Sequence, residues 1–296
     1  MAILAGAGLA PAADIPLPPV NLGDTSFQDG IGFPGWVAEE TIGYYHAGHF
    51  NDHRGEKIPG SNSLTTVSAT THLAFITHLR LLGGFYGAEV ILPVAHLDID
   101  TSFGPNEQHG GFGDLAVSPL ILQWSDHTIF GRPYFHRLDF VVTLPTGEYH
   151  RSRPVNIGNN LVSVNPYYAF TLVAAAKLEV SARLHYLWNS ENAEPFRGLR
   201  ATSIQPGQAF HANYAASYEL FEGLRLGVNG YVLQQISADK IDGRGQPNSE
   251  ERVVGIGPGM QWTIYGLSAY VNSYVETAAK NRPEGVKVLF RLSKTF

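Results

Sequence analysis

The sequence has 296 residues, no cysteine and a formal net charge of −6 at pH 7. The lack of cysteine excludes a disulfide scaffold and thiolate metal sites, and an acidic chain without clustered Lys and Arg argues against a nucleic-acid surface. No run of 18 apolar residues exists, which excludes a membrane-spanning helix but not barrel strands of about 9–11 residues. The content of 32 Gly, 14 Tyr and 16 Phe, with 16% charged residues, favours an all-β chain.

The first 34 residues precede the predicted strands. Residues 1–13 are small and apolar, and Ala10-Pro11-Ala12 resembles a signal-peptidase site without a basic region before it, so we expect an export-signal remnant or a flexible tail. Residues 14–34 are rich in Pro and Gly and should be irregular. Because they also carry apolar side chains such as Leu17 and Phe27, we expect them to insert in part into the lumen as a plug.

Two-residue alternation of apolar and polar side chains predicts β-strands over the rest of the chain, 35–296. The clearest case is 177–189, where apolar positions from Leu178 to Trp188 alternate with polar ones such as Glu179. Twelve strands are predicted, at 35–48, 64–79, 83–98, 112–124, 135–148, 161–174, 177–189, 207–221, 224–236, 252–265, 267–279 and 285–296.

The predicted connections alternate in length. Polar loops such as 99–111 and 237–251 alternate with tight turns such as Tyr265-Gly266, although the turn from Ser125 to Pro133 is longer than this pattern prefers. An even number of strands with tight turns at one end predicts a transmembrane antiparallel β-barrel with both termini periplasmic. Because backbone groups in hydrocarbon must all be paired, the first and last strands should join and close the barrel.

The positions that alternate with the apolar face should point into the lumen, where both signs of charge are mixed. Two roles are open for each of these side chains: selectivity in a narrow pore, or ion pairs that only stiffen the wall. The lumen candidates are Arg137, Asp139, Glu179, Arg183, His185, His211, Asn213, Glu219, Arg225, Asn229 and Arg291.

Four prolines fall in four successive predicted strands, and proline cannot donate to a ladder of backbone hydrogen bonds. One interpretation is a locally opened wall, through which a hydrophobic substrate leaves sideways into the outer leaflet. The alternative is that the prolines sit at bulges or strand ends, and a continuous ladder across these strands would contradict the exit. The candidates are Pro93, Pro119, Pro145 and Pro166.

Metal and nucleotide chemistry are not expected. His46, His49 and His53 lie close in the sequence, but no carboxylate or further histidine is fixed beside them. The glycine-rich run 255–259 contains Pro258 and is not followed by a helical pattern, so it is not a nucleotide-binding loop. We therefore expect no catalytic residue, metal or cofactor.

Six segments, taken together and in order, resemble the outer-membrane channel family named for the MetA pathway of phenol degradation, also called SphA-like proteins. The resemblance covers about residues 27–296, and it implies a monomeric twelve-stranded barrel of a Gram-negative outer membrane that takes up aromatic and other hydrophobic compounds. It carries over no ligand residues. The segments are GFGDLAVSPLILQW at 111–124, LPTGEY at 144–149, NIGNNLVSVNPYYAFT at 156–171, PGQAFHANYAASYEL at 206–220, LGVNGYVLQQISADK at 226–240 and VVGIGPGM at 253–260.

The expected function is passive uptake of small hydrophobic, including aromatic, compounds across the outer membrane. The alternative is an outer-membrane enzyme, such as a lipase built on a twelve-stranded barrel, which needs a Ser–His pair on the lipid-facing surface. Histidines such as His185 and His211 fall on the inward face, which disfavours the enzyme. Expected partners are membrane lipid, lipopolysaccharide and the barrel-assembly machinery, because the final strand ends on Phe296 like the signal that this machinery reads.

Overall fold

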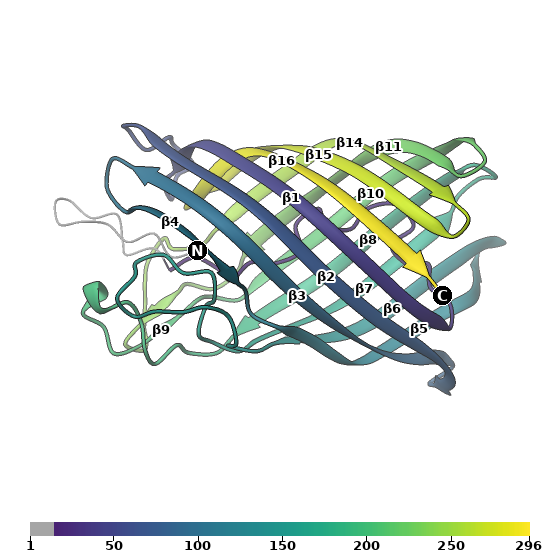
Figure 1. Cartoon of the computed structure of the whole chain (residues 1–296), viewed down its shortest axis with the longest axis horizontal. Helices are drawn as coiled ribbons and strands as arrows, with labels where there is room; N and C mark the ends of the chain where they lie inside the picture. The colour runs from purple at the N-terminus through teal and green to yellow at the C-terminus, as the bar shows by residue number, and fades with distance from the viewer. Residues whose placement is uncertain (1–14) are drawn as a thin grey trace.

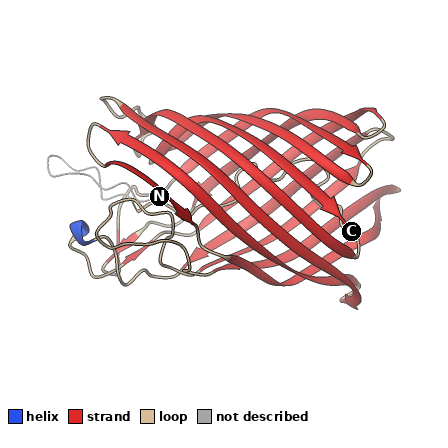
Figure 2. Ribbon diagram, viewed as in Figure 1, coloured by secondary structure: helices blue, strands red, loops and turns tan. Residues whose placement is uncertain are grey.

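The computed structural model describes residues 15–296, and within them no helix is long and apolar enough to span a membrane. Twelve long strands of this part of the chain form an antiparallel barrel (Figures 1 and 2). They are β1 (Gly35–Asn51), β2 (Asn62–Leu81), β3 (Gly84–Thr101), β5 (Ala116–Ile129), β6 (Arg132–Thr143), β7 (Ser163–Val173), β8 (Leu178–Asn189), β10 (Ala209–Phe221), β11 (Leu224–Gln235), β14 (Arg252–Ile264), β15 (Leu267–Lys280) and β16 (Arg282–Thr295).

The barrel is closed by β1, which pairs with β2 on one side and with β16 on the other. Ile42 lies opposite Ala69 of β2 and opposite Phe290 of β16. The predicted junction of the first and last strands is therefore confirmed, and it leaves neither of them as a free edge.

The two faces of the wall differ as the alternation predicts. On β8, Leu184 is 51% exposed on the outer surface, whereas Glu179 is 2% exposed and faces inward. Aromatic side chains such as Trp188, Phe210 and Trp262 are among the exposed ones on the outer face. A wall that is apolar outside and polar inside is the pattern of a transmembrane barrel.

The two ends of the barrel also differ. At the short-turn end, adjacent strands are joined by two-residue turns such as Leu82-Gly83 and Phe130-Gly131. The long turn predicted from Ser125 to Pro133 is wrong, because β5 continues to Ile129 and β6 begins at Arg132. These strand ends are polar, so their sequence lacks apolar alternation although the backbone ladder continues.

At the other end, here called the long-loop end, loops and short elements cover the barrel. The predicted loop 99–111 is also wrong, because β3 extends to Thr101 and β4 (Asn106–Phe112) pairs with it. A small sheet made of β9 (Ile204–Gln205), β12 (Lys240–Ile241) and β13 (Arg244–Gly245), with the 3-10 helix η1 (Arg197–Leu199), belongs to the loops 190–208 and 236–251.

Candidate functional site

Residues 15–34, here called the inner segment, lie inside the barrel and run along its length. Near the long-loop end, the backbone N–H of Leu17 donates to Glu251 Oε1 at 2.7 Å. Near the short-turn end, the hydroxyl of Ser125 donates to the carbonyl of Gly32, just before β1 begins. The described chain therefore starts at the long-loop end, while Phe296 lies at the short-turn end (Figure 1). Residues 1–13, expected to be a signal remnant or tail, lie outside the described residues.

Wall side chains that are far away in sequence hold the inner segment. The backbone N–H groups of Gly23, Gln28 and Gly30 donate to Asn213, Glu179 and Thr171, at 2.8, 3.0 and 2.9 Å. Two ion pairs add to this. Asp24 pairs with Lys287 at 3.1 Å, and Asp29 accepts a 2.9 Å hydrogen bond from Arg183 Nε. The irregular backbone that the sequence predicted is thus satisfied by polar groups of the wall.

A cavity of about 1040 Å³ occupies the rest of the lumen, and it is bounded unevenly. Inner side chains of β1, β2 and β3 line it along much of their length, while none from β10 or β14 does. The inner segment contacts those two strands instead, for example where Gln261 Nε2 donates to Gln28 Oε1 at 2.7 Å. The open passage therefore runs along the β1–β3 side.

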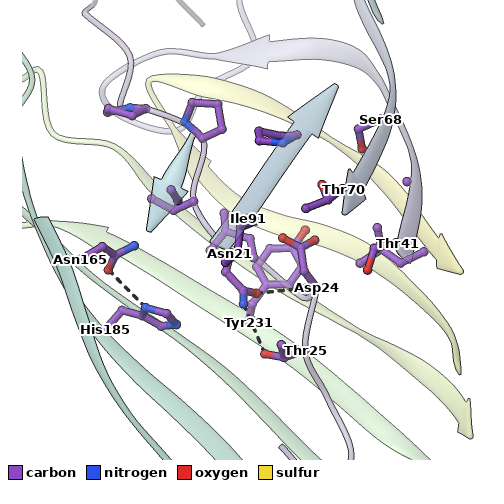
Figure 3. A pocket seen from close by; sticks show the side chains of 18 of the residues that line it. Asn21, Asp24, Thr25, Thr41, Ser68, Thr70, Ile91, Asn165, His185 and Tyr231 are labelled. Atoms are coloured by element: carbon purple, nitrogen blue, oxygen red, sulfur yellow. Dashed lines mark hydrogen bonds between the residues drawn. The ribbon is translucent and has the colours of Figure 1, made fainter. Parts of the chain in front are cut away.

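The β1–β3 side of the passage has a polar and an apolar strip next to each other. β1 and β2 supply a row of hydroxyls that includes Thr41, Ser68 and Thr70, while β3 supplies Ile91 and further apolar side chains. In Figure 3, these hydroxyls lie on one side of the passage and the hydrogen-bonded pair Asn165 and His185 on the other. A molecule with an apolar body and a polar edge can contact both strips at once.

Charged side chains line the passage on β1, β2, β3 and β16. His72 lies between two carboxylates, with Nδ1 2.8 Å from Glu39 Oε2 and Nε2 2.9 Å from Glu89 Oε2. An imidazole can donate to two carboxylates at once only in its protonated, positively charged form. Arg291 is 3.5 Å from Glu39 on the other side. Sequence analysis missed these groups on β1–β3 because the outer face of β2 also carries polar residues such as Thr71, which weakens its alternation.

Of the predicted lumen residues, Arg137, Arg183, His185 and Arg291 line the cavity. The other seven do not. Glu179 and Asn213 contact the inner segment, Arg225 lies within 3.5 Å of Glu179 and Glu219, and His211 stacks on His185 with ring centroids 4.1 Å apart. Asp139 accepts a hydrogen bond from Tyr167, and Asn229 is buried. A role in selectivity stays a prediction for all eleven.

The loop 144–162 folds over the passage at the long-loop end. Val155 is fully buried in an apolar cluster with Phe50 and Ile99 of the wall. Asp114 fixes the loop by accepting hydrogen bonds from the backbone N–H groups of Gly147 and Asn159, both at 2.8 Å. One carboxylate thus holds the loop against the junction of β4 and β5.

Two buried carboxyls outside the spanning strands hold the loops at the same end. Asp239 accepts hydrogen bonds from Gly207 N and Gln235 Nε2, both at 2.8 Å. Burial raises the pKa of Asp239 to about 8, and the nearby carboxylate of Glu251 contributes to this. Burial also raises the pKa of Glu251, although Arg282 opposes the shift.

Three of the four predicted prolines lie at interruptions of the wall. At Pro93, β3 changes partner from β5 to β4. Pro119 lies in a bulge of β5, and at Pro166 the pairing of β7 with β8 is interrupted. The prediction that Pro145 lies in a strand is wrong, because β6 ends at Thr143. Beyond Thr143 the chain continues as the loop that Asp114 fixes.

The wall between β6 and β7 is continuous, with ten successive pairs from Tyr134 opposite Leu172 to Thr143 opposite Ser163. The ladder therefore stops or shifts at single places and is not open over the whole region from β3 to β7. The lateral exit stays a hypothesis.

In residues 15–296, no group of three or more His, Asp or Glu side chains is arranged so that it could hold a metal ion. Of the three clustered histidines, His46 lies 3.0 Å from the hydroxyl of Thr65 and His49 lies 3.5 Å from Glu284. His53 is exposed on the loop after β1.

A family model described as "Putative MetA-pathway of phenol degradation" matches residues 47–292. The crystal structure of an outer membrane channel from Pseudomonas putida F1 is similar with a TM-score of 0.81 at 16% identity, covering 94% of this chain and all of that one. The transport unit of the autotransporter AIDA-I from Escherichia coli gives a TM-score of 0.54 at 10% identity, covering 94% and 93% of the two chains. No curated protein matches. The structural similarities show the barrel fold.

Proposed function

Because the chain belongs to the family described as the putative MetA pathway of phenol degradation, we propose that it is an outer-membrane channel for passive uptake of small hydrophobic compounds, aromatic ones included. The observation that carries the proposal is the passage along β1–β3, where apolar side chains such as Ile91 lie beside a row of hydroxyls. The P. putida protein of the same fold is itself an outer membrane channel. The long-loop end would then face outward and the short-turn end the periplasm. In this orientation Phe296 is periplasmic as expected, whereas Leu17, near the start of the described chain, lies toward the outer side and not the periplasmic side that the sequence predicted for both termini.

The test is uptake by liposomes that contain the purified protein and have lipopolysaccharide in the outer leaflet, because benzyl alcohol crosses a plain phospholipid bilayer unaided. Benzyl alcohol should enter faster than it enters protein-free liposomes, and a sugar of similar mass should gain much less. Equal rates with and without protein would contradict the channel.

The alternative of a lipid-cleaving enzyme has little support. Among residues 15–296, no serine hydroxyl is hydrogen-bonded to a histidine, and the buried His185 and His211 lie inside the barrel. A lipase needs its nucleophile and base on the surface that lipid can reach. If the purified protein in lipid hydrolyses no ester, the result supports the channel and not the lipid-cleaving enzyme.

We propose that the inner segment acts as a plug. Its hydrogen bonds and two ion pairs with the wall support this role, because they keep residues 15–34 across most of the lumen. Deleting residues 14–30 should raise single-channel conductance several-fold. Unchanged conductance would contradict the plug.

A lateral exit would lie where β3 changes partner. Pro93, Gly113 and Ala116 line the cavity there, so a short path joins the lumen to the wall junction. A disulfide between Ile91→Cys and Ala116→Cys, which are opposite each other on β3 and β5, should restrain the junction. Oxidation should slow uptake of a hydrophobic substrate if exit is lateral.

The matched control is Thr41→Cys with Thr70→Cys, another opposed pair that lines the cavity, but on the continuous β1–β2 ladder. Its oxidation should leave uptake unchanged. Because the natural chain has no cysteine, each variant forms one disulfide. Equal effects of the two disulfides would exclude the lateral exit.

A further inference from the structure

Arg137 differs from the other inward cations in lacking a counter-ion. Among residues 15–296, the guanidiniums of Arg183, Arg225, Arg282 and Arg291 each lie within 4 Å of a carboxylate oxygen, but that of Arg137 does not. Its Nε donates to the neutral amide oxygen of Gln123 at 2.8 Å. A cation shielded from bulk water with no carboxylate in direct contact is costly, so an anion that binds it directly gains more than it would in water.

The surroundings of Arg137 leave the guanidinium accessible. Arg137 lines the cavity, and its neighbour across the strand pair is Ala169 of β7, a small residue that is fully buried. The next residue in this row is Arg183 of β8, whose charge is taken by Asp29 of the inner segment. Across β6, β7 and β8, the inward side chains thus include one arginine that is paired with a carboxylate, Arg183, and one that is not, Arg137.

Gly32 of the inner segment keeps this space open. A Cβ at residue 32 would lie 2.8 Å from Nη2 of Arg137 and 2.6 Å from Oε1 of Gln123. Any side chain there would press on the guanidinium edge, so the segment passes Arg137 with its smallest residue. Gly32 therefore packs against Nη2 without displacing the guanidinium, and Arg137 keeps its place on the cavity wall.

The rest of the cavity wall limits the ligand further. Ile91, Ile121 and Val141 line the same cavity and suit an apolar body. Asp139 is two residues from Arg137 on the same face of β6, but it already accepts the hydroxyl of Tyr167 at 2.8 Å. Together with Glu89, which is bound to His72, it would repel a second negative charge on the ligand.

From this arrangement we propose that Arg137 is the binding site for the carboxylate of a small apolar monoacid, such as a benzoate, inside the lumen. A planar carboxylate accepts two parallel N–H groups of a guanidinium, which is the strongest pairing that this side chain makes with a small anion. The proposal rests on the proposed channel function and narrows its substrate class to compounds that combine an apolar ring with a single negative charge.

The test is equilibrium binding of radiolabelled benzoate to the purified full-length protein in detergent, with benzyl alcohol as the uncharged ligand of the same ring. Wild type should bind benzoate saturably. Arg137→Gln should weaken benzoate binding at least about 10-fold and leave benzyl alcohol binding unchanged. Arg137→Lys should keep part of the affinity, because it retains the charge but loses the paired donors.

Arg132→Gln is the matched control, because Arg132 begins the same strand but is exposed and does not line the cavity. It should bind benzoate like wild type, and the heat-dependent shift in gel mobility should show that each variant is folded. No saturable benzoate binding by wild type, unchanged binding by Arg137→Gln, or an equal loss for both ligands would each overturn the site. Failure of liposome uptake while benzoate binding persists would instead count against the channel.

Discussion

Gly23 shows how one residue fits the inner segment into the barrel. Its φ is +84°, and a Cβ there would lie 2.7 Å from the ring of Tyr274. Gly23→Ala combines a left-handed backbone with this contact, which should cost the docked segment about 1–2 kcal/mol. Single-channel recordings should show more frequent or larger openings. Gly48→Ala, which meets no atom within 4 Å, should behave like wild type.

Asp239 makes the long-loop end sensitive to pH. Burial raises its pKa to about 8, well above the value of the unfolded chain, so the folded loops bind its proton more tightly. Its stabilising effect is therefore fully present below about pH 4 and is lost as pH rises through about 8. Hydrogen exchange in residues 236–251 should become faster over this range in the wild type.

Asp239→Asn is the matched variant, because the amide keeps an acceptor oxygen for Gly207 and Gln235 but does not titrate. The rise in exchange with pH, after correction for the intrinsic rate, should be smaller in this variant. An identical profile in both proteins would exclude Asp239 as its source.

At the scale of single elements, one tight turn holds a leucine in a backbone conformation that a substitution could relieve. Leu82 has a φ of +51° before Gly83 and is 88% exposed, so its side chain gains little packing from a backbone that leucine disfavours. Asparagine tolerates this conformation better and is preferred in such turns. Leu82→Asn should raise the free energy of unfolding by about 1 kcal/mol.

Urea unfolding in lipid vesicles measures this change. Leu81→Asn serves as the control, because Leu81 lies in β2 with an ordinary strand backbone and should gain nothing from the substitution. A gain of the same size in both variants would mean that reduced surface hydrophobicity, and not turn geometry, is responsible.

Strands were predictable from the sequence where lipid lies on one side and polar contacts on the other. The alternation in 177–189 therefore agrees closely with β8. Alternation did not predict the end of β5 or any of β4, which includes the polar run from Asn106 to His109. Strands outside the apolar layer of the membrane need not alternate. Backbone pairing continues there without a signal in the side chains.

The candidate site was predictable only in part, for a different reason. Inward positions such as Arg137 and Arg183 follow from alternation, but which of them stay open depends on where the inner segment packs. That choice rests on contacts such as Gln28 with Glu179, 151 residues apart in the chain, and no local pattern records them.

For the molecule as a whole, the junction between β1 and β16 allows the free energy of unfolding and the rate of assisted assembly to be tested separately. Phe296 exchanges backbone hydrogen bonds with Trp36, at 2.9 and 3.3 Å, while its side chain is 73% exposed. Phe296→Ala should therefore leave the free energy of unfolding unchanged, and it should slow insertion by the barrel-assembly machinery if that machinery reads the side chain. The rate at which the folded form appears in proteoliposomes with the machinery measures this effect, and unassisted refolding in detergent is the control. Equal slowing in both would point to a general folding defect.

The two aspartates of the inner segment should make its position in the barrel depend on voltage. Residues 15–34 contain Asp24 and Asp29 but no Lys or Arg, so any sliding of the segment along the barrel axis carries two negative charges through the membrane field. Each elementary charge that crosses 100 mV changes the free energy by about 2.3 kcal/mol, so a full traverse of both would change it by about 4.6 kcal/mol. The current through such a barrel should rectify, and neutralising the two aspartates should make it symmetric in polarity.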